Sequence, residues 1–301
     1  MNILVTGGTG LIGKALISQL HNCNITVLSR NPQQASQQLG ASVKAIASLD
    51  QLDDLDPFDA VINLAGEPII NKRWTDNQKE KIRQSRWGLT QTLVDKCHAG
   101  SNPPHTFISG SAVGIYGNQH EETITEDFNI GAQVKADDFA HQVCQQWEYI
   151  ALKAQSEQTR VCLLRTGIVL AKQGGALAKM LPPYQLGLGG PIGSGKQYFP
   201  WIHIEDMVQA ILFLLHTPHT EGAFNLTAPE PVTNKVFSQA LAKTLRRPHL
   251  LFTPAFVLKA ALGEASSLLL DGQRAIPAKL EQFGYTFRHP QLGEALEDLL
   301  N

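Results

Sequence analysis

Strands and helices alternate along the first half of the chain, as judged from the spacing of its hydrophobic residues. Short and mostly apolar runs, typical of strands covered on both faces, occur at 3–5, 25–28, 60–64, 106–109 and 161–165. Patterns typical of helices occupy 11–20, 76–97 and 134–154. This alternation predicts βαβ units, and therefore an α/β fold with a doubly wound parallel sheet of the Rossmann type.

The character of the sequence changes after about residue 170. The pairs Gly174-Gly175 and Pro182-Pro183 and the glycine-rich run 187–195 predict loops. Helices are expected at 205–215, 233–245, 256–262 and 292–300, and a short strand at 223–226. We therefore expect a Rossmann domain over 1–170, to which segments near 197–226 return, and a smaller C-terminal lobe over 171–301 that faces the substrate.

Composition excludes several classes of protein. Of the 301 residues, 43% are hydrophobic and 17% charged, and no uncharged apolar run reaches the roughly 18 residues of a membrane span. The first residues enter a strand-like run directly, without the features of a signal peptide, so we expect a cytoplasmic protein. The four cysteines form no C-x-x-C pair, and no metal site is expected. A net charge of -2 does not favour a nucleic-acid partner.

A glycine-rich turn joins the first predicted strand to the first predicted helix. Residues 6–13 read Thr-Gly-Gly-Thr-Gly-Leu-Ile-Gly and contain G-x-G-x-x-G. Glycines permit a sharp turn, a close approach of the backbone to a pyrophosphate and tight packing of helix on strand, while the start of the helix offers free N–H donors. Because the motif lies between a strand and a helix, it predicts a dinucleotide site. The expected contacts are Gly7, Thr9, Gly10, Leu11 and Ile12.

The end of the second predicted strand indicates which dinucleotide is bound. Proteins that bind NAD usually place an acidic residue there, on the ribose 2′-hydroxyl. This chain has Ser29 and Arg30 instead, which can bind a 2′-phosphate through a hydroxyl and a guanidinium. We therefore expect NADP(H) as the cofactor; the alternative is that Arg30 is a solvated turn residue. Residues at the end of the third predicted strand, where small side chains would let the backbone approach the cofactor, are expected to line the same groove: Leu64, Ala65, Gly66 and Glu67.

Together these motifs resemble the short-chain dehydrogenase/reductase superfamily, in its extended branch of nucleoside-diphosphate-sugar-epimerase-like proteins. Further matching segments are 109–112 with 116–117, 164–167 and 201–206, and the stretch 187–195 resembles the atypical "epimerase family protein" subgroup. The resemblance implies that Ser111 is the catalytic serine. It also implies cofactor contacts at Ser109, Gly110, Arg165 and Gly167. Arg86 is implied to reach the cofactor phosphates, unless it is a solvated helix residue.

The usual catalytic pair of this branch is a Tyr-x-x-x-Lys motif that exchanges a proton while nicotinamide exchanges a hydride. Counting forward from Ser111 and back from Arg165 places the pair at Phe139 and Val143, so we expect the dyad to be missing. Tyr149 and Lys153 fit the motif, but they lie about 15 Å further along the same predicted helix. We therefore interpret this tyrosine and lysine as surface residues.

Two functions remain open on the sequence alone. The first is an NADP(H)-dependent oxidoreductase or epimerase that acts on a small or sugar-like substrate and takes its proton from another residue. The candidate proton donors are Ser111, Tyr116, His141 and His203. The second is a non-catalytic NADP(H)-binding sensor or partner-binding protein. The sequence leaves the substrate, the reaction direction and the oligomeric state undetermined.

Overall fold

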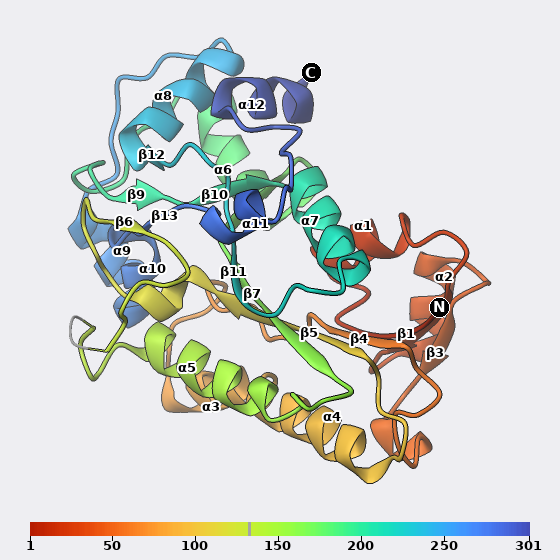
Figure 1. The fold of residues 1–301 in the computed structure, drawn as a ribbon. Helices are drawn as coiled ribbons and strands as arrows, with labels where there is room; N and C mark the ends of the chain where they lie inside the picture. Colours follow the sequence, from red (N-terminus) through yellow and green to blue (C-terminus); the bar gives the residue numbers. More distant parts are fainter. Residues whose placement is uncertain (132–133) are drawn as a thin grey trace.

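A seven-stranded parallel sheet forms the centre of the protein, in a computed structural model that describes residues 1–131 and 134–301 (Figure 1). The strand order is β11-β7-β5-β4-β1-β2-β3, and every adjacent pair is parallel. The predicted doubly wound α/β fold is confirmed. The strands are β1 (Asn2–Thr6), β2 (Asn24–Leu28), β3 (Lys44–Ile46), β4 (Ala60–Asn63), β5 (Thr106–Ala112), β7 (Arg160–Thr166) and β11 (Gly222–Leu226).

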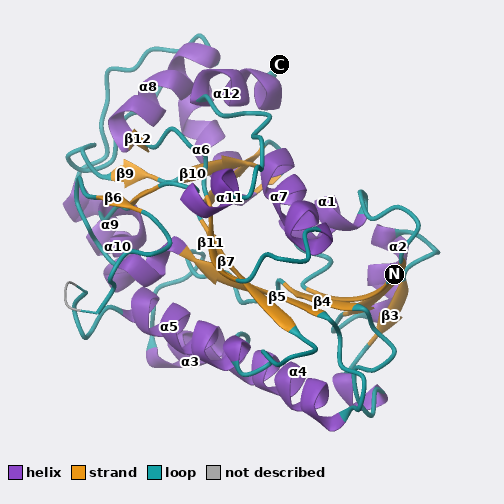
Figure 2. Cartoon of the chain, viewed as in Figure 1, coloured by secondary structure: helices purple, strands orange, loops and turns teal. Residues whose placement is uncertain are grey.

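Helices cover both faces of this sheet (Figure 2). One face carries α1 (Leu11–Ile17), α2 (Pro32–Leu39) and α7 (Ile204–His216), and the other carries α3 (Asp76–Gln84), α4 (Trp87–Ala99) and α5 (Phe139–Leu152). Alternate strand residues feed the two resulting cores, since successive side chains of a strand point to opposite faces. Ile3 and Val5 thus pack with the α1 and α7 side, while Leu4 packs with the α4 and α5 side.

A second group of elements lies beyond the β11 and β7 end of the sheet (Figure 1). Its core includes Leu177, Trp201, Phe237 and Leu296, all buried. The remaining elements are β6 (Thr123–Ile124), β8 (Ile168–Ala171), α6 (Gly175–Gln185), β9 (Tyr198–Phe199), β10 (Trp201–His203), β12 (Val232–Thr233), α8 (Asn234–Thr244), α9 (Ala255–Leu262), α10 (Ser267–Leu270), β13 (Arg274–Ala275), α11 (Ala278–Gln282) and α12 (Leu292–Leu300).

Two of the predicted long helices differ in the structure. The helix expected over 76–97 is two helices, α3 and α4, because the chain breaks at Ser85 and Arg86, whose side chains bond to the backbone of Glu67. The helix expected from 134 begins at Phe139, where Asp138 caps it by accepting a hydrogen bond from the backbone N–H of residue 141 at 3.1 Å. Tertiary contacts and capping set both boundaries.

Other differences arise where local sequence is ambiguous. The Pro182-Pro183 pair, expected in a loop, lies inside α6, whose residues Leu177, Leu181 and Tyr184 are buried on one side. Packing of this face offsets the poor helix propensity of proline. Neither α2 nor β3 was predicted from the sequence. Pro32 nevertheless follows the capping residue Asn31, as is usual at a helix start.

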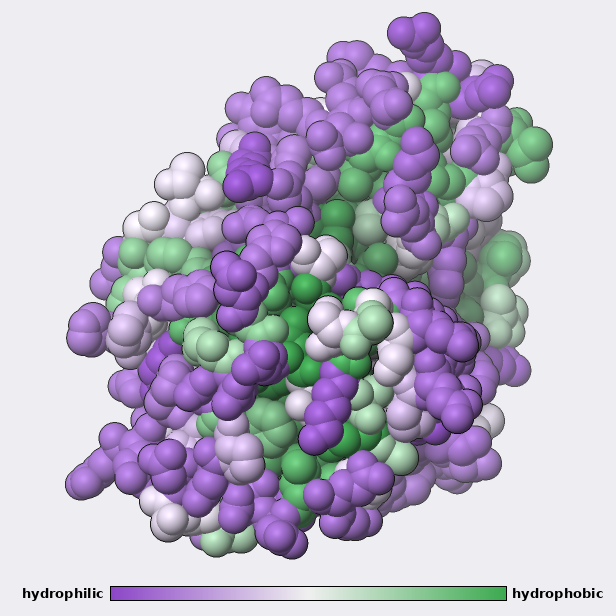
Figure 3. Space-filling view, turned by 90° about the vertical axis from the view of Figure 1, so that its right-hand side faces the viewer, coloured by the Kyte–Doolittle hydropathy of each residue, from purple (hydrophilic) through white to green (hydrophobic). Residues whose placement is uncertain are grey.

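The surface is mostly hydrophilic on the side that carries α1 and α2, with hydrophobic residues gathered in a band across its middle (Figure 3). Among the helices of the described residues, none has the length and apolar character needed to cross a membrane.

Candidate cofactor site

A cavity of about 970 Å³ opens at the carboxyl ends of β1, β2 and β4. In an open α/β sheet this edge is where ligands bind. The glycine turn, the residues after β2 and the residues after β4 all reach it. The expected contacts that line it are Gly7, Thr9, Gly10, Ser29, Arg30, Leu64, Ala65, Gly66 and Glu67.

The glycine turn is built by close backbone packing. Gly7 has a φ of +70°, which side chains rarely adopt, and a Cβ there would lie 2.6 Å from the carbonyl carbon of Leu64. A Cβ on Gly13 would lie 2.3 Å from the carbonyl oxygen of Gly7. Only glycine can therefore hold the turn against the loop after β4. Helix α1 then starts at the cavity without a side-chain cap at Gly10.

A chain of buried hydrogen bonds supports the loop after β4. The Thr6 hydroxyl donates to Asn63 Oδ1 at 2.6 Å and accepts the backbone N–H of Ala65 at 3.2 Å. Asn63 Nδ2 and Trp147 Nε1 both donate to the Thr90 hydroxyl, at 2.8 and 2.9 Å. This chain fixes the cavity wall. Sequence reasoning missed these positions, although a polar residue at the end of an apolar strand, as at Asn63, is a feature that could have identified them.

The cavity is polar where β2 ends. Ser29 exchanges hydrogen bonds of 3.2 Å with the backbone of Asn31, and Arg30 is exposed at the cavity rim. Lys14, on α1, also lines the cavity and adds a second cation that sequence reasoning missed. Asp50, in the segment after β3, contributes a carboxylate to the same wall and was missed as well.

Arg86 is held by the protein behind the loop after β4. Its Nη1 donates to the carbonyl of Glu67 at 3.0 Å, and its guanidinium lies 5.2 Å from the centre of the Trp147 ring. Burial lowers the pKa of Arg86 from its ordinary value. Gly66 makes room for it, because a Cβ there would lie 2.9 Å from the guanidinium carbon. Arg86 is therefore half-buried and bound to the protein, and its side chain does not line the cavity.

Ser111 belongs to a buried network between β5, β7 and α5. Its hydroxyl donates to Glu148 Oε1 at 2.6 Å. Arg165 donates to both oxygens of Glu148, at 2.9 Å each, and to the Tyr116 hydroxyl, also at 2.9 Å. Tyr116 in turn donates to Asn225 Oδ1 at 2.7 Å. Sequence reasoning missed Glu148, which links the expected catalytic serine to the expected cofactor-binding arginine.

The surroundings shift the pKa of two members of this network, Tyr116 and Arg165. Burial raises the pKa of Tyr116 to about 12, so its hydroxyl stays neutral. Burial lowers the pKa of Arg165, but the hydrogen bonds and charge of Glu148 outweigh this effect and raise it above its ordinary value. The buried guanidinium is thus paired, as a buried charge must be.

The other expected contacts lie in packed surroundings. A Cβ on Gly110 would lie 2.7 Å from the Trp147 ring, and one on Gly167 would lie 2.2 Å from the carbonyl oxygen of Pro200. Ser109 is buried within 3.4 Å of Asn63 Nδ2. Leu11 and Ile12 are half-buried at the start of α1. These five residues, together with Arg86, Ser111 and Arg165, do not line the cavity described above.

The two positions assigned to the catalytic dyad lie in an apolar cluster. Phe139 and Val143 are 3% and 1% exposed and pack with Ile82 and Trp74, whose ring meets that of Phe139 edge-on at 4.9 Å. Tyr149, by contrast, is 58% exposed, so the prediction that it lies on the surface is confirmed.

These features identify the class of protein. The chain belongs to the NAD dependent epimerase/dehydratase family, whose profile matches residues 3–227. A second profile, a domain of unknown function (DUF1731), matches residues 253–299. The family resemblance expected from the sequence motifs is confirmed.

Particular relatives cover nearly the whole chain. Epimerase family protein SH2119 of Staphylococcus haemolyticus is 39% identical, over 99% of this chain and 98% of its own. The crystal structure of human epimerase family protein SDR39U1 with NADPH is 35% identical and superposes with a TM-score of 0.90, covering 99% of each chain. UDP-glucuronic acid 4-epimerase from Bacillus cereus, in complex with UDP-glucuronic acid and NAD, shares the fold, with a TM-score of 0.75, 17% identity and coverage of 99% and 98%.

Proposed function

We propose that this protein binds NADP(H) in the cavity beside the glycine turn. The observation that carries the proposal is that Ser29 and Arg30 line the cavity at the end of β2, where an NAD-binding protein would offer a carboxylate to the ribose. Arg30 and Lys14 supply positive charge for a 2′-phosphate. The NADPH in the structure of the human relative supports the same choice.

The remaining expected residues divide into two groups under this proposal. Gly7, Thr9, Gly10 and residues 64–67 contact the cofactor directly, with Leu11 and Ile12 offering backbone N–H groups at the start of α1. The other residues expected to contact the cofactor lie outside the cavity lining, and under this proposal they support the groove by packing and hydrogen bonding: Arg86, Ser109, Gly110, Arg165 and Gly167.

We further propose an oxidoreductase or epimerase reaction that proceeds without the usual tyrosine and lysine, on a small or sugar-like substrate. Bound NADP(H) would supply or accept the hydride. Ser111 is the catalytic residue of this proposal. The Ser111 oxygen would take the proton of a substrate hydroxyl while its own proton passes to Glu148 Oε1, 2.6 Å away, and the reverse reaction would return both protons.

The cofactor assignment is tested with Arg30→Glu. Losing a charge-assisted contact costs about 1.5–3 kcal/mol, so NADPH should bind roughly tenfold to a hundredfold more weakly, while NADH affinity stays within about twofold. Arg247→Glu makes the same charge change at an exposed position of the other lobe and should alter neither affinity. Calorimetric titration with both cofactors measures this. Equal losses for NADPH and NADH would refute the assignment.

A second candidate function is a non-catalytic NADP(H)-binding protein. The burial of Phe139 and Val143 in an apolar cluster favours it, because neither side chain can transfer a proton. A panel of carbonyl compounds with NADPH separates the two functions. Oxidation of NADPH by any member supports the enzyme, whereas tight NADPH binding with no oxidation across the panel supports the sensor.

A further inference from the structure

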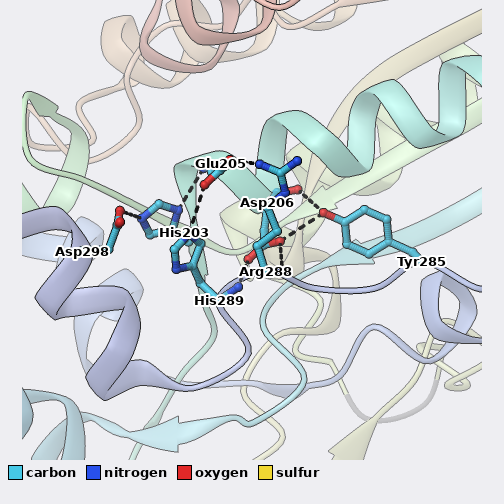
Figure 4. Close-up of polar contacts among 7 residues, drawn as sticks. All are labelled: His203, Glu205, Asp206, Tyr285, Arg288, His289 and Asp298. Atoms are coloured by element: carbon cyan, nitrogen blue, oxygen red, sulfur yellow. Dashed lines mark hydrogen bonds and ion pairs between the residues drawn. The ribbon is translucent and has the colours of Figure 1, made fainter.

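Two histidines stack where the C-terminal segment meets the start of α7 (Figure 4). His203 is 3% exposed, and its ring centre lies 3.8 Å from that of His289, with an angle of 32° between the planes. Nδ1 of His203 accepts the backbone N–H of Glu205 at 3.0 Å and so caps α7. Nε2 lies 3.2 Å from Oδ2 of Asp298, on α12. His203 therefore caps α7 and lies next to a carboxylate that is far away in sequence, although its Nε2 does not have hydrogen-bond geometry toward Asp298.

The same joint is held by the two carboxylates that follow His203. Asp206 is fully buried and accepts three hydrogen bonds from the C-terminal segment: from the Tyr285 hydroxyl at 3.1 Å and from the backbone N–H groups of Arg288 and His289 at 2.8 and 2.9 Å. Glu205 pairs with the side chains of Arg288 and His289. All of these partners lie in the segment matched by the domain of unknown function.

A proton on His203 disrupts this arrangement in three ways. Nδ1 now accepts a hydrogen bond from the backbone N–H of Glu205. Once protonated, Nδ1 would be a donor that faces this other donor. The proton would also put a positive charge at a helix N-terminus, which already carries a partial positive charge. Finally, it would set that charge in a buried position against the His289 ring.

The carboxylates around His203 oppose these effects only in part. Glu205 and Asp206 on α7 and Asp298 on α12 all favour the charged imidazole. Burial and the neighbouring His289 outweigh them, so the pKa of His203 is below its usual range.

We propose that the stacked pair His203 and His289 is a pH-sensitive joint that helps to hold the C-terminal segment, residues 285–300, against the start of α7 and weakens this contact in mild acid. In the open state His203 regains an ordinary pKa of about 6.5 and binds a proton more readily than in the closed state. Lowering the pH below about 6.5 therefore favours opening, by up to about tenfold per pH unit for one proton, until the pH reaches the lowered pKa of the closed state.

The same side chains could instead hold a metal, since donor atoms of His203, Glu205 and His289 lie within 4.8 Å of one another. The contacts favour the hydrogen-bonded joint. Nδ1 of His203 already caps α7, and the Glu205 carboxylate is already paired with Arg288 and with His289. Adding Zn²⁺ in the hydrogen-exchange experiment below distinguishes a metal site from a hydrogen-bonded joint.

Hydrogen exchange of the full-length protein, read by mass spectrometry and corrected for intrinsic rates, tests the proposal. Between about pH 6.5 and pH 5.5, protection of α12 should fall by up to about fivefold relative to β5. His203→Asn keeps a capping oxygen but cannot titrate, and should abolish the fall. His216→Asn, at the exposed end of the same helix, should retain it.

Asp298→Asn is a second test that leaves the buried residues in place, because the Asp298 side chain is 56% exposed. The carboxylate of Asp298 favours the charged form of His203, so without it the pKa of His203 in the closed state should be lower still. Protection of α12 should therefore continue to fall to lower pH than in the wild type. The proposal is overturned if His203→Asn keeps the wild-type pH dependence, if α12 and β5 lose protection equally, or if Asp298→Asn changes nothing. It is also overturned if Zn²⁺ protects α12 at neutral pH and a chelator reverses the effect.

Discussion

Replacing Glu148 with leucine should strongly destabilise the protein, because it removes the charge partner of a buried arginine. The side chains of Glu148 and Arg165 are 8% and 9% exposed, and two hydrogen bonds of 2.9 Å join them. Among the residues that the structure describes, the guanidinium in Glu148→Leu keeps two hydrogen-bond partners, the Tyr116 hydroxyl at 2.9 Å and the Glu126 carbonyl at 3.2 Å. Ser111 also loses the acceptor of its hydroxyl.

The magnitude follows from what the substitution leaves behind. Breaking a buried ion pair on one side costs about 3–5 kcal/mol, which is a large part of the roughly 5–15 kcal/mol of a whole domain. Removing both charges in Glu148→Leu with Arg165→Met should cost less than the single change, since no unpaired charge remains. The pair of half-buried Arg83 and exposed Glu80 provides the control, and Glu80→Gln should cost less than about 0.5 kcal/mol.

Urea unfolding followed by circular dichroism measures all three variants, with tryptophan fluorescence as a second probe of two-state behaviour. A cost below about 1 kcal/mol for Glu148→Leu would refute the reasoning, because the arginine would then have found another partner or water. A double variant less stable than Glu148→Leu alone would show that the pair is not the source of the cost.

Three further predictions concern the glycine turn, the thiols and the apolar cluster. In urea unfolding, Gly7→Ala should cost more than about 1–2 kcal/mol, and it should abolish NADPH binding, because the φ of Gly7 is +70° and its Cβ would meet the Leu64 backbone at 2.6 Å. Gly293→Ala, in open space on α12, should instead stabilise the protein by up to about 1 kcal/mol in the same assay. Burial raises the pKa of Cys97 to about 12, so at neutral pH a thiol reagent should label only half-buried Cys23 rapidly, and rapid labelling of two or more thiols would contradict the buried placement. Phe139→Ala should cost about 3–5 kcal/mol in urea unfolding, and a loss below about 1 kcal/mol would show that the cluster with Trp74 contributes little.

Several features of the protein could be read from local sequence. The sheet follows from short apolar runs such as 60–64, because strands buried on both faces need apolar residues throughout. The glycine turn is equally local, since its conformation depends on residues within one strand-turn-helix unit. The expected contacts at Ser29, Arg30 and 64–67 reach one cavity because parallel strands end at the same edge of a sheet.

Tertiary structure decided what local patterns leave undetermined. The break between α3 and α4 depends on bonds from Ser85 and Arg86 to Glu67, and the prolines of α6 are tolerated because its buried face packs well. The same holds for the polar chemistry. Ser111 was identified by its motif. Its hydrogen bond to Glu148, however, joins residues 37 positions apart and depends on the tertiary structure.

The joint of His203 and His289 shows the limit most clearly. His203 stands just before a predicted helix that has acidic residues in its first turn. Both features can be read from the local sequence. It does not indicate which distant segment stacks on that histidine, since any exposed loop could supply the partner. Only the packing of the C-terminal segment against α7, with Asp206 accepting hydrogen bonds from residues 82 and 83 positions away, brings the two rings together.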